Sequence, residues 1–136
     1  MGINNIVIVD DEIELAEMLK EQFQLKGASN VLTFSSADAA FNHCLKQIGG
    51  EAFPEILITD YKMPKVTGLD LVRKLRGNQD LKSIPIIMMT AHGEEELIRN
   101  GAKAGIKDFI MKPFKMEFIQ KRVEVMLLRS MLKSSK

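Results

Sequence analysis

Short, uninterrupted apolar runs recur along this chain, and four of them end on a polar residue of a different kind. The runs, each with the polar residue that follows it, are 6–9 with Asp10, 56–59 with Asp60, 86–89 with Thr90 and 109–111 with Lys112. Continuous apolar runs are typical of parallel strands buried on both faces, whereas half-exposed strands alternate apolar and polar residues. The pattern therefore predicts neighbouring parallel strands.

Stretches with apolar residues at helical spacing separate these runs, so strands and helices alternate five times. The predicted strands are 3–9, 31–34, 55–59, 86–90 and 106–111. The predicted helices are 12–26, a second one capped by Ser36 and ending near residue 49, then 69–76, 94–103 and one from 115 towards the end. Five such units predict an α/β fold, a doubly wound parallel sheet of flavodoxin-like (βα)5 type with strand order 2-1-3-4-5. An eight-unit barrel needs about 250 residues.

The size and charge of the chain narrow its class further. It has 136 residues, 46% apolar and 27% charged, with a net charge of +1. We expect one domain over 1–136, with a core of about 5–127 and residues 128–136 as an extension of the last helix or a tail. The charge balance and the lack of room for a helix-turn-helix argue against direct nucleic-acid binding. No apolar run or signal-peptide pattern indicates a membrane segment, so we expect a cytoplasmic protein without membrane contact.

The polar residues after the strands are expected to converge, because ligands of open α/β sheets bind at the carboxyl ends of the strands. Carboxylates from Asp10, Asp11 and Asp60 would meet the hydroxyl of Thr90 and the ammonium of Lys112. Each residue alone could be a turn former, a helix cap or a loop residue. Together they suit a hard divalent cation such as Mg²⁺ and a phosphoryl group.

Four short motifs carry a family resemblance. They are Val-Asp-Asp-Glu at 9–12, Asp-Tyr-Lys-Met-Pro at 60–64 followed by Gly68, Met-Thr-Ala at 89–91, and Lys-Pro-Phe at 112–114. From about residue 5 to about residue 127, the chain resembles a chemotaxis-type receiver domain of the response regulators in two-component signalling. The resemblance implies a signalling phosphoprotein in a phosphorelay, which catalyses only its own phosphorylation and dephosphorylation.

The resemblance also implies the roles of the acidic residues. Asp60 would accept a phosphoryl group from a sensor histidine kinase or a phosphotransfer protein. Asp11 and Asp60 would bind Mg²⁺ directly together with the main-chain carbonyl of Lys62, and Asp10 would bind it through water.

Further roles follow from the same resemblance. Lys112 would pair with the phosphoryl group, and its bond to Pro113 would be cis. Thr90 would move towards the phosphoryl oxygen, and Phe109 would fill the vacated space as a switch residue, although it could equally be an ordinary core residue of its strand. The surface formed by the fourth helix, the fifth strand and the fifth helix would then signal to a partner or an output domain.

Two positions near the site would tune the lifetime of the phosphoryl group. Lys62 follows Asp60 by two residues, and His92 follows Thr90 by two. We hypothesise that Lys62 covers the site and slows hydrolysis, or pairs with Glu12. His92 is more typical of a solvated turn.

Other functions fit the residues less well. A flavin mononucleotide binder would need a phosphate-binding loop where the acidic residues 10–12 stand. No G-x-G-x-x-G follows a strand, which argues against a dinucleotide enzyme. A phosphatase of the haloacid dehalogenase type pairs its nucleophile with a second Asp two residues later, where this chain has Lys62.

The last helix carries more apolar residues than one buried face requires. Val125, Leu128 and Leu132 are spaced like heptad positions. Three interpretations stay open: a frayed tail, a homodimer through this helix, and a linker to an output domain.

Overall fold

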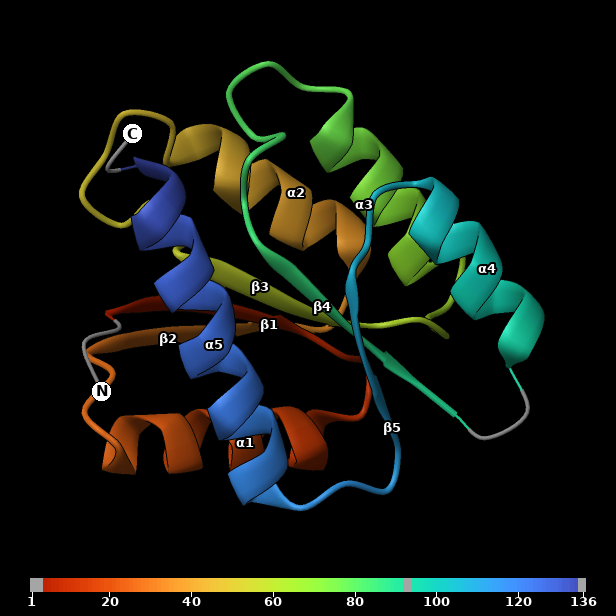
Figure 1. Ribbon diagram of the computed structural model, residues 1–136, viewed down its shortest axis with the longest axis horizontal. Coiled ribbons are helices and arrows are strands. Elements are labelled where there is room, and N and C mark those ends of the chain that lie inside the picture. Colours follow the sequence, from red (N-terminus) through yellow and green to blue (C-terminus); the bar gives the residue numbers. More distant parts are fainter. Residues whose placement is uncertain (1–3, 92–93, 135–136) are drawn as a thin grey trace.

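A parallel sheet lies between two layers of helices in the computed structural model of the chain (Figure 1). The structure describes residues 4–91 and 94–134. Its strands are β1 (Asn5–Val9), β2 (Asn30–Phe34), β3 (Ile56–Asp60), β4 (Ile86–Thr90) and β5 (Asp108–Met111). All neighbours pair in parallel in the order β2-β1-β3-β4-β5, which confirms the predicted topology.

Helices cover both faces of the sheet (Figure 1). One layer contains α1 (Ile13–Leu25) and α5 (Met116–Ser134). The other layer contains α2 (Ala37–Lys46), α3 (Gly68–Arg76) and α4 (Glu95–Lys103). No helix of residues 4–91 and 94–134 is long and apolar enough to cross a membrane.

Alternate residues of each strand enter two separate cores, which explains the uninterrupted apolar runs. In β3, Ile56 and Ile58 pack with α1 and α5, whereas Leu57 packs with α2 and α3. Both faces of the strand are therefore buried, and each position favours an apolar side chain.

Most predicted boundaries differ from the observed ones by one or two residues. The predicted cap of α2 is confirmed, because the Ser36 hydroxyl accepts the N–H of Ala39 at 3.2 Å. The start of β5 was predicted two residues too early. Ile106 is buried, but its N–H donates to the carbonyl of Gly101 at 2.9 Å in the turn that closes α4, where Gly105 has a φ of +99°. An apolar residue buried in a helix-capping turn therefore has the same sequence pattern as the first residue of a buried strand.

The end of β3 and the start of α3 approach each other closely. The N–H of Gly68 donates to the carbonyl of Tyr61 at 2.8 Å, and a Cβ at Gly68 would clash with the carbonyl oxygen of Asp60. The Thr67 hydroxyl accepts the N–H of Asp70, whose side chain in turn accepts the N–H of Thr67. This capping box fixes the entry to α3, and the glycine lets that entry lie directly against the backbone of Asp60.

Candidate functional site

Three buried polar residues stand at the carboxyl ends of neighbouring strands. Asp10 follows β1, Asp60 ends β3 and Thr90 ends β4, and all three are almost completely buried. The N–H of Lys112, just after β5, donates to the carbonyl of Thr90 at 2.7 Å. The structure thus brings the sequence-predicted residues to one edge of the sheet, as parallel strand order requires.

Lys112 is the cation at the centre of this edge. Its Nζ lies 3.1 Å from Asp10 Oδ2, 3.3 Å from Glu12 Oε1 and 3.4 Å from Asp60 Oδ1. Burial opposes the charged ammonium, but the hydrogen bond and charge of Asp10 and the charges of Asp60 and Glu12 outweigh burial and raise the pKa of Lys112. Lys112 therefore stays protonated and holds the carboxylates together.

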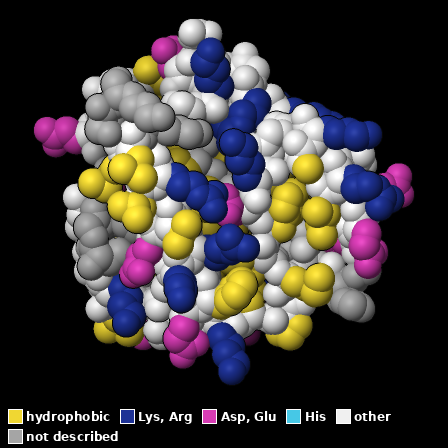
Figure 2. Space-filling view, viewed as in Figure 1, with side chains coloured by type: hydrophobic (Ala, Val, Ile, Leu, Met, Phe, Trp, Pro, Cys, Tyr) yellow, Lys and Arg dark blue, Asp and Glu magenta, His cyan; other side chains and the backbone are white. Residues whose placement is uncertain are grey.

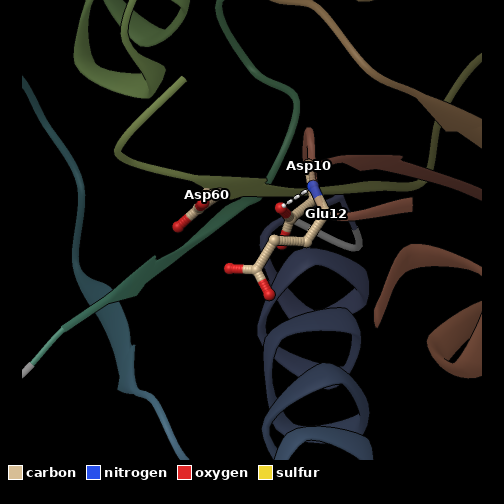
Figure 3. Close-up of side chains that lie close together, drawn as sticks. All are labelled: Asp10, Glu12 and Asp60. Carbon is tan, nitrogen blue, oxygen red and sulfur yellow. Dashed lines mark hydrogen bonds between the residues drawn. The ribbon is translucent and has the colours of Figure 1, made fainter. Parts of the chain in front are cut away.

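The carboxylates of Asp10, Glu12 and Asp60 lie close together (Figure 3). One oxygen from each of Asp10, Glu12 and Asp60 can be chosen so that all three oxygens lie within 4.8 Å of one another. The N–H of Glu12 donates to Asp10 Oδ1 at 2.9 Å, which turns the start of α1 towards the cluster (Figure 3). Clustered carboxylate oxygens are the donors that hard divalent cations prefer. The acidic cluster can therefore hold a metal ion.

The electrostatics of Asp60 differ from those of an exposed aspartate. Burial raises its pKa from 3.8 to about 6, and the charge of Asp10 adds to the increase. Lys112 and the N–H of Tyr61, which donates to Asp60 Oδ1 at 3.0 Å, oppose it. At neutral pH the carboxylate form of Asp60 still dominates. A further positive charge close by would stabilise this form.

Thr90 ends β4 with a buried hydroxyl. Its Oγ1 has no hydrogen-bond partner within the described residues. Buried hydroxyls are nearly always satisfied, so an orphan at the edge of an acidic cluster is a donor available to a ligand.

Phe109 lies on β5 and is partly buried, with its ring against α4. A Cβ at Gly101 would lie 2.9 Å from Phe109 Cζ and 3.0 Å from Cε1. The absence of a side chain on α4 therefore makes room for this ring.

The structure places the remaining predicted residues as follows. Asp11 is exposed and lies outside the acidic cluster, and Lys62 is exposed on the loop after β3. Glu12 pairs with Lys112 rather than with Lys62. The Lys112–Pro113 peptide bond is cis. His92 lies outside the described residues.

Glu12 is the cluster member that the sequence analysis left out of the metal set. Its signal was its position in the Val-Asp-Asp-Glu motif, directly before the first predicted helix. Asp10 Oδ1 accepts the N–H of Glu12, and the resulting turn brings the Glu12 side chain back over the strand ends.

Comparison with known proteins identifies the class. The family model for the response regulator receiver domain matches residues 6–124. The chain therefore belongs to the family of response regulator receiver domains, which are signalling modules of two-component systems rather than conventional enzymes. Membership of this family implies a histidine kinase as partner.

Individual relatives span nearly the same length. The chemotaxis protein CheY1 of Helicobacter pylori is 33% identical over 122 residues, which cover 90% of this chain and 95% of that protein. The chemotaxis protein CheY of Pseudomonas aeruginosa is 30% identical over 119 residues, covering 88% and 92%. The crystal structure of a putative response regulator from Chloroflexus aurantiacus superposes with a TM-score of 0.83 at 30% identity, covering 93% and 99%.

Proposed function

We propose that Asp60 accepts a phosphoryl group from a phosphohistidine of a sensor histidine kinase or a phosphotransfer protein. The observation that carries this proposal is the buried Asp60 carboxylate at the end of β3, with the Lys112 ammonium 3.4 Å away. An Asp60 oxygen attacks phosphorus, the bond from phosphorus to the imidazole nitrogen breaks, and the histidine leaves. Water later hydrolyses the acyl phosphate and restores the carboxylate.

Mg²⁺ fits the donor set of the site. We propose that Asp60 and Asp11 bind it directly together with the carbonyl of Lys62, and that Asp10 binds it through water. Asp11 has no hydrogen bond or ion pair within the described residues, so its carboxylate is free to turn towards a cation, whereas Glu12 is held by Lys112. When bound, Mg²⁺ would neutralise charge on the phosphoryl oxygens. Lys112 supplies a second positive charge there and orients the carboxylates.

The orphan hydroxyl of Thr90 supports a further part of the proposal. Phosphoryl oxygens on Asp60 would give Thr90 Oγ1 an acceptor, which it lacks among the described residues. Phe109 then moves into the space that Thr90 leaves, and the surface of α4, β5 and α5 changes shape. A partner protein or an output domain reads this surface.

The organisation proposed for the chain is one receiver domain over 1–136, with a core of about 5–127. The family model ends at residue 124, whereas α5 continues as a helix to Ser134. Leu128, Met131 and Leu132 are well exposed on this extension, which supports pairing with a second copy or with an output domain. Light scattering tests the homodimer by comparing the full chain with a chain truncated after Val123. If the two have the same oligomeric state, a homodimer through α5 is excluded.

The central experiment measures intact mass after incubation with acetyl phosphate, with and without Mg²⁺. The unaltered chain should gain one phosphoryl group only with Mg²⁺, and Asp60→Asn should gain none. Asp80→Asn is a matched control, because Asp80 is exposed on the loop between α3 and β4, at the opposite edge of the sheet from Asp60. An equal mass gain in Asp60→Asn would exclude Asp60 as the acceptor.

A further inference from the structure

A groove lies at the edge of the sheet opposite the acidic cluster, where β4 and β5 begin. Its volume is about 890 Å³, within the range of about 300–1,000 Å³ typical of ligand sites. The loop from α3 to β4, the turn before β5 and the last turns of α5 form its walls. Lys and Arg side chains run as a band down the middle of the face between α5 and β5 (Figure 2).

Positive charge dominates the groove. Its cationic lining residues are Arg76, Lys82, Lys107 and Arg129. Asp108 is its one acidic lining residue within the described chain, and this buried carboxylate is shared by Arg129 and Arg122 at 3.4 Å each. The other three cations have no carboxylate partner within the described residues. Among the described residues, the groove therefore has uncompensated positive charge, in a chain whose net charge is only +1.

Arg76 is the most constrained of these cations. Its Nη1 donates to the carbonyls of Lys82 at 2.7 Å and Ile84 at 2.9 Å, so the guanidinium is fixed by neutral acceptors. Burial lowers its pKa, and no carboxylate of the described residues offsets that cost. Its Nε edge faces Gly105, where a Cβ would lie 3.6 Å from Nε. A guanidinium held in this way keeps donors with which it can bind a carboxylate.

The floor of the groove is aliphatic. Ile84, Pro85, Ile86 and Met126 line it, and no aromatic side chain does within the described residues. Sites for single-stranded nucleic acid or nucleotides use aromatic rings on which bases stack, and this groove offers none. A ligand that combines carboxylates with aliphatic side chains matches both the floor and the cations.

We propose that this groove binds an acidic peptide segment of a partner protein. Carboxylates of the segment pair with Arg76, Lys82 and Lys107, and an apolar side chain of the segment packs on the half-buried Pro85. Because the groove lies at the amino ends of the strands, this inference does not depend on phosphorylation of Asp60.

The test uses the full chain and a fluorescein-labelled peptide in which pairs of Glu alternate with Leu and Phe, followed by fluorescence anisotropy. The double variant Lys82→Glu with Lys107→Glu should weaken binding at least about tenfold, since two attractions become repulsions. The matched control is Lys26→Glu with Lys46→Glu, which changes the same charge on exposed lysines outside the groove. Its affinity should stay within about twofold, because exposed charges away from the contact are screened.

Further probes separate the remaining outcomes. A peptide with Gln for Glu, and one with Ser for Leu and Phe, should each bind more weakly. Asp60→Asn should bind the acidic peptide as the unaltered chain does, which separates this site from the proposed phosphoacceptor. Absence of binding at millimolar peptide, equal losses in both double variants, or tighter binding of an oligothymidine probe would each overturn the proposal. Self-association that the peptide does not displace, and that Lys82→Glu with Lys107→Glu abolishes, would assign the groove to a second copy instead and would also overturn it.

Discussion

Lys112 Nζ lies 3.1 Å from Asp10 Oδ2, and the side chain of Asp10 is 0% exposed. This pair joins the residue after β1 to the residue after β5, which are 102 positions apart in the chain. Asp10 already accepts the N–H of Glu12 with its other oxygen. The lysine is therefore the charge partner that makes a buried aspartate tolerable at the strand ends.

Removing this lysine should cost stability. Lys112→Ala leaves Asp10 and Asp60 buried without a cation, and we expect a loss of about 3 kcal/mol in the free energy of unfolding at neutral pH without metal. Urea unfolding measures this loss. Lys74→Ala is the control, because Lys74 pairs with Asp38 where both side chains are at least half exposed, and it should cost less than about 1 kcal/mol. Equal costs would mean that the buried pair contributes no more than a surface pair.

The raised pKa of Asp60, about 6, predicts how stability depends on pH. A carboxyl whose pKa is higher in the folded than in the unfolded state stabilises the fold below pH 3.8, and this contribution is lost as the pH rises through 6. Metal-free Asp60→Asn should therefore be more stable than the unaltered chain at pH 7.5, by at most about 3 kcal/mol. Thermal unfolding with a chelator from pH 4 to pH 7.5 measures the difference, which should vanish towards pH 4. A stabilisation independent of pH would contradict this cause.

Mg²⁺ affinity distinguishes the two acidic residues that follow Asp10. Asp11→Asn should weaken Mg²⁺ binding at least about tenfold. Glu12→Gln should weaken it less, because the Glu12 carboxylate already forms an ion pair with Lys112. The chain has no Trp, and its one Tyr is Tyr61, whose N–H donates to Asp60. Tyrosine fluorescence during Mg²⁺ titration therefore reports from beside the site. The reverse ranking would place Glu12 in the metal set instead of Asp11.

Lys62 should control the lifetime of the phosphoryl group. It is exposed on the loop after β3, and its side chain makes no hydrogen bond or ion pair with residues 4–91 and 94–134. The side chain can therefore cover the path of attacking water. Lys62→Ala should therefore lose phosphate faster than the unaltered chain, as measured by the decay of the phosphorylated mass after the donor is removed. Lys46→Ala, an exposed lysine on α2, should decay at the original rate. An unchanged rate in Lys62→Ala would exclude the shielding role.

Gly101 and Phe109 should be energetically coupled. Alanine favours a helix interior over glycine by about 1 kcal/mol, but a Cβ at Gly101 would meet the Phe109 ring at 2.9 Å. Gly101→Ala should therefore gain little stability in the unaltered chain and about 1 kcal/mol in a Phe109→Ala background. A double-mutant cycle by urea unfolding measures this difference. Additive effects would show that the ring moves aside without cost.

The sequence was sufficient for the sheet order and for the convergence at its carboxyl edge, for a physical reason. Strands buried on both faces are recognisable one at a time, and parallel order then places residues such as Asp60 and Thr90 side by side. Details that depend on backbone turns were harder to predict. The turn that returns Glu12 to the cluster, and the capping turn that buries Ile106, leave no periodic signal in the sequence.

The basic groove could not be predicted from the sequence at all. Arg76, Lys107 and Arg129 come from three separate segments, and none belongs to a recognisable motif. Only the packing of α5 against the start of β4 and β5 brings them together.

The two edges of the parallel sheet also differ in charge. The acidic cluster lies at the carboxyl edge of the sheet and the basic groove at the amino edge, separated by strands of about 17 Å. A net charge of +1 therefore conceals two regions of opposite charge. The chain should orient itself before it touches any charged surface, and at low ionic strength it should be retained on both cation- and anion-exchange resins.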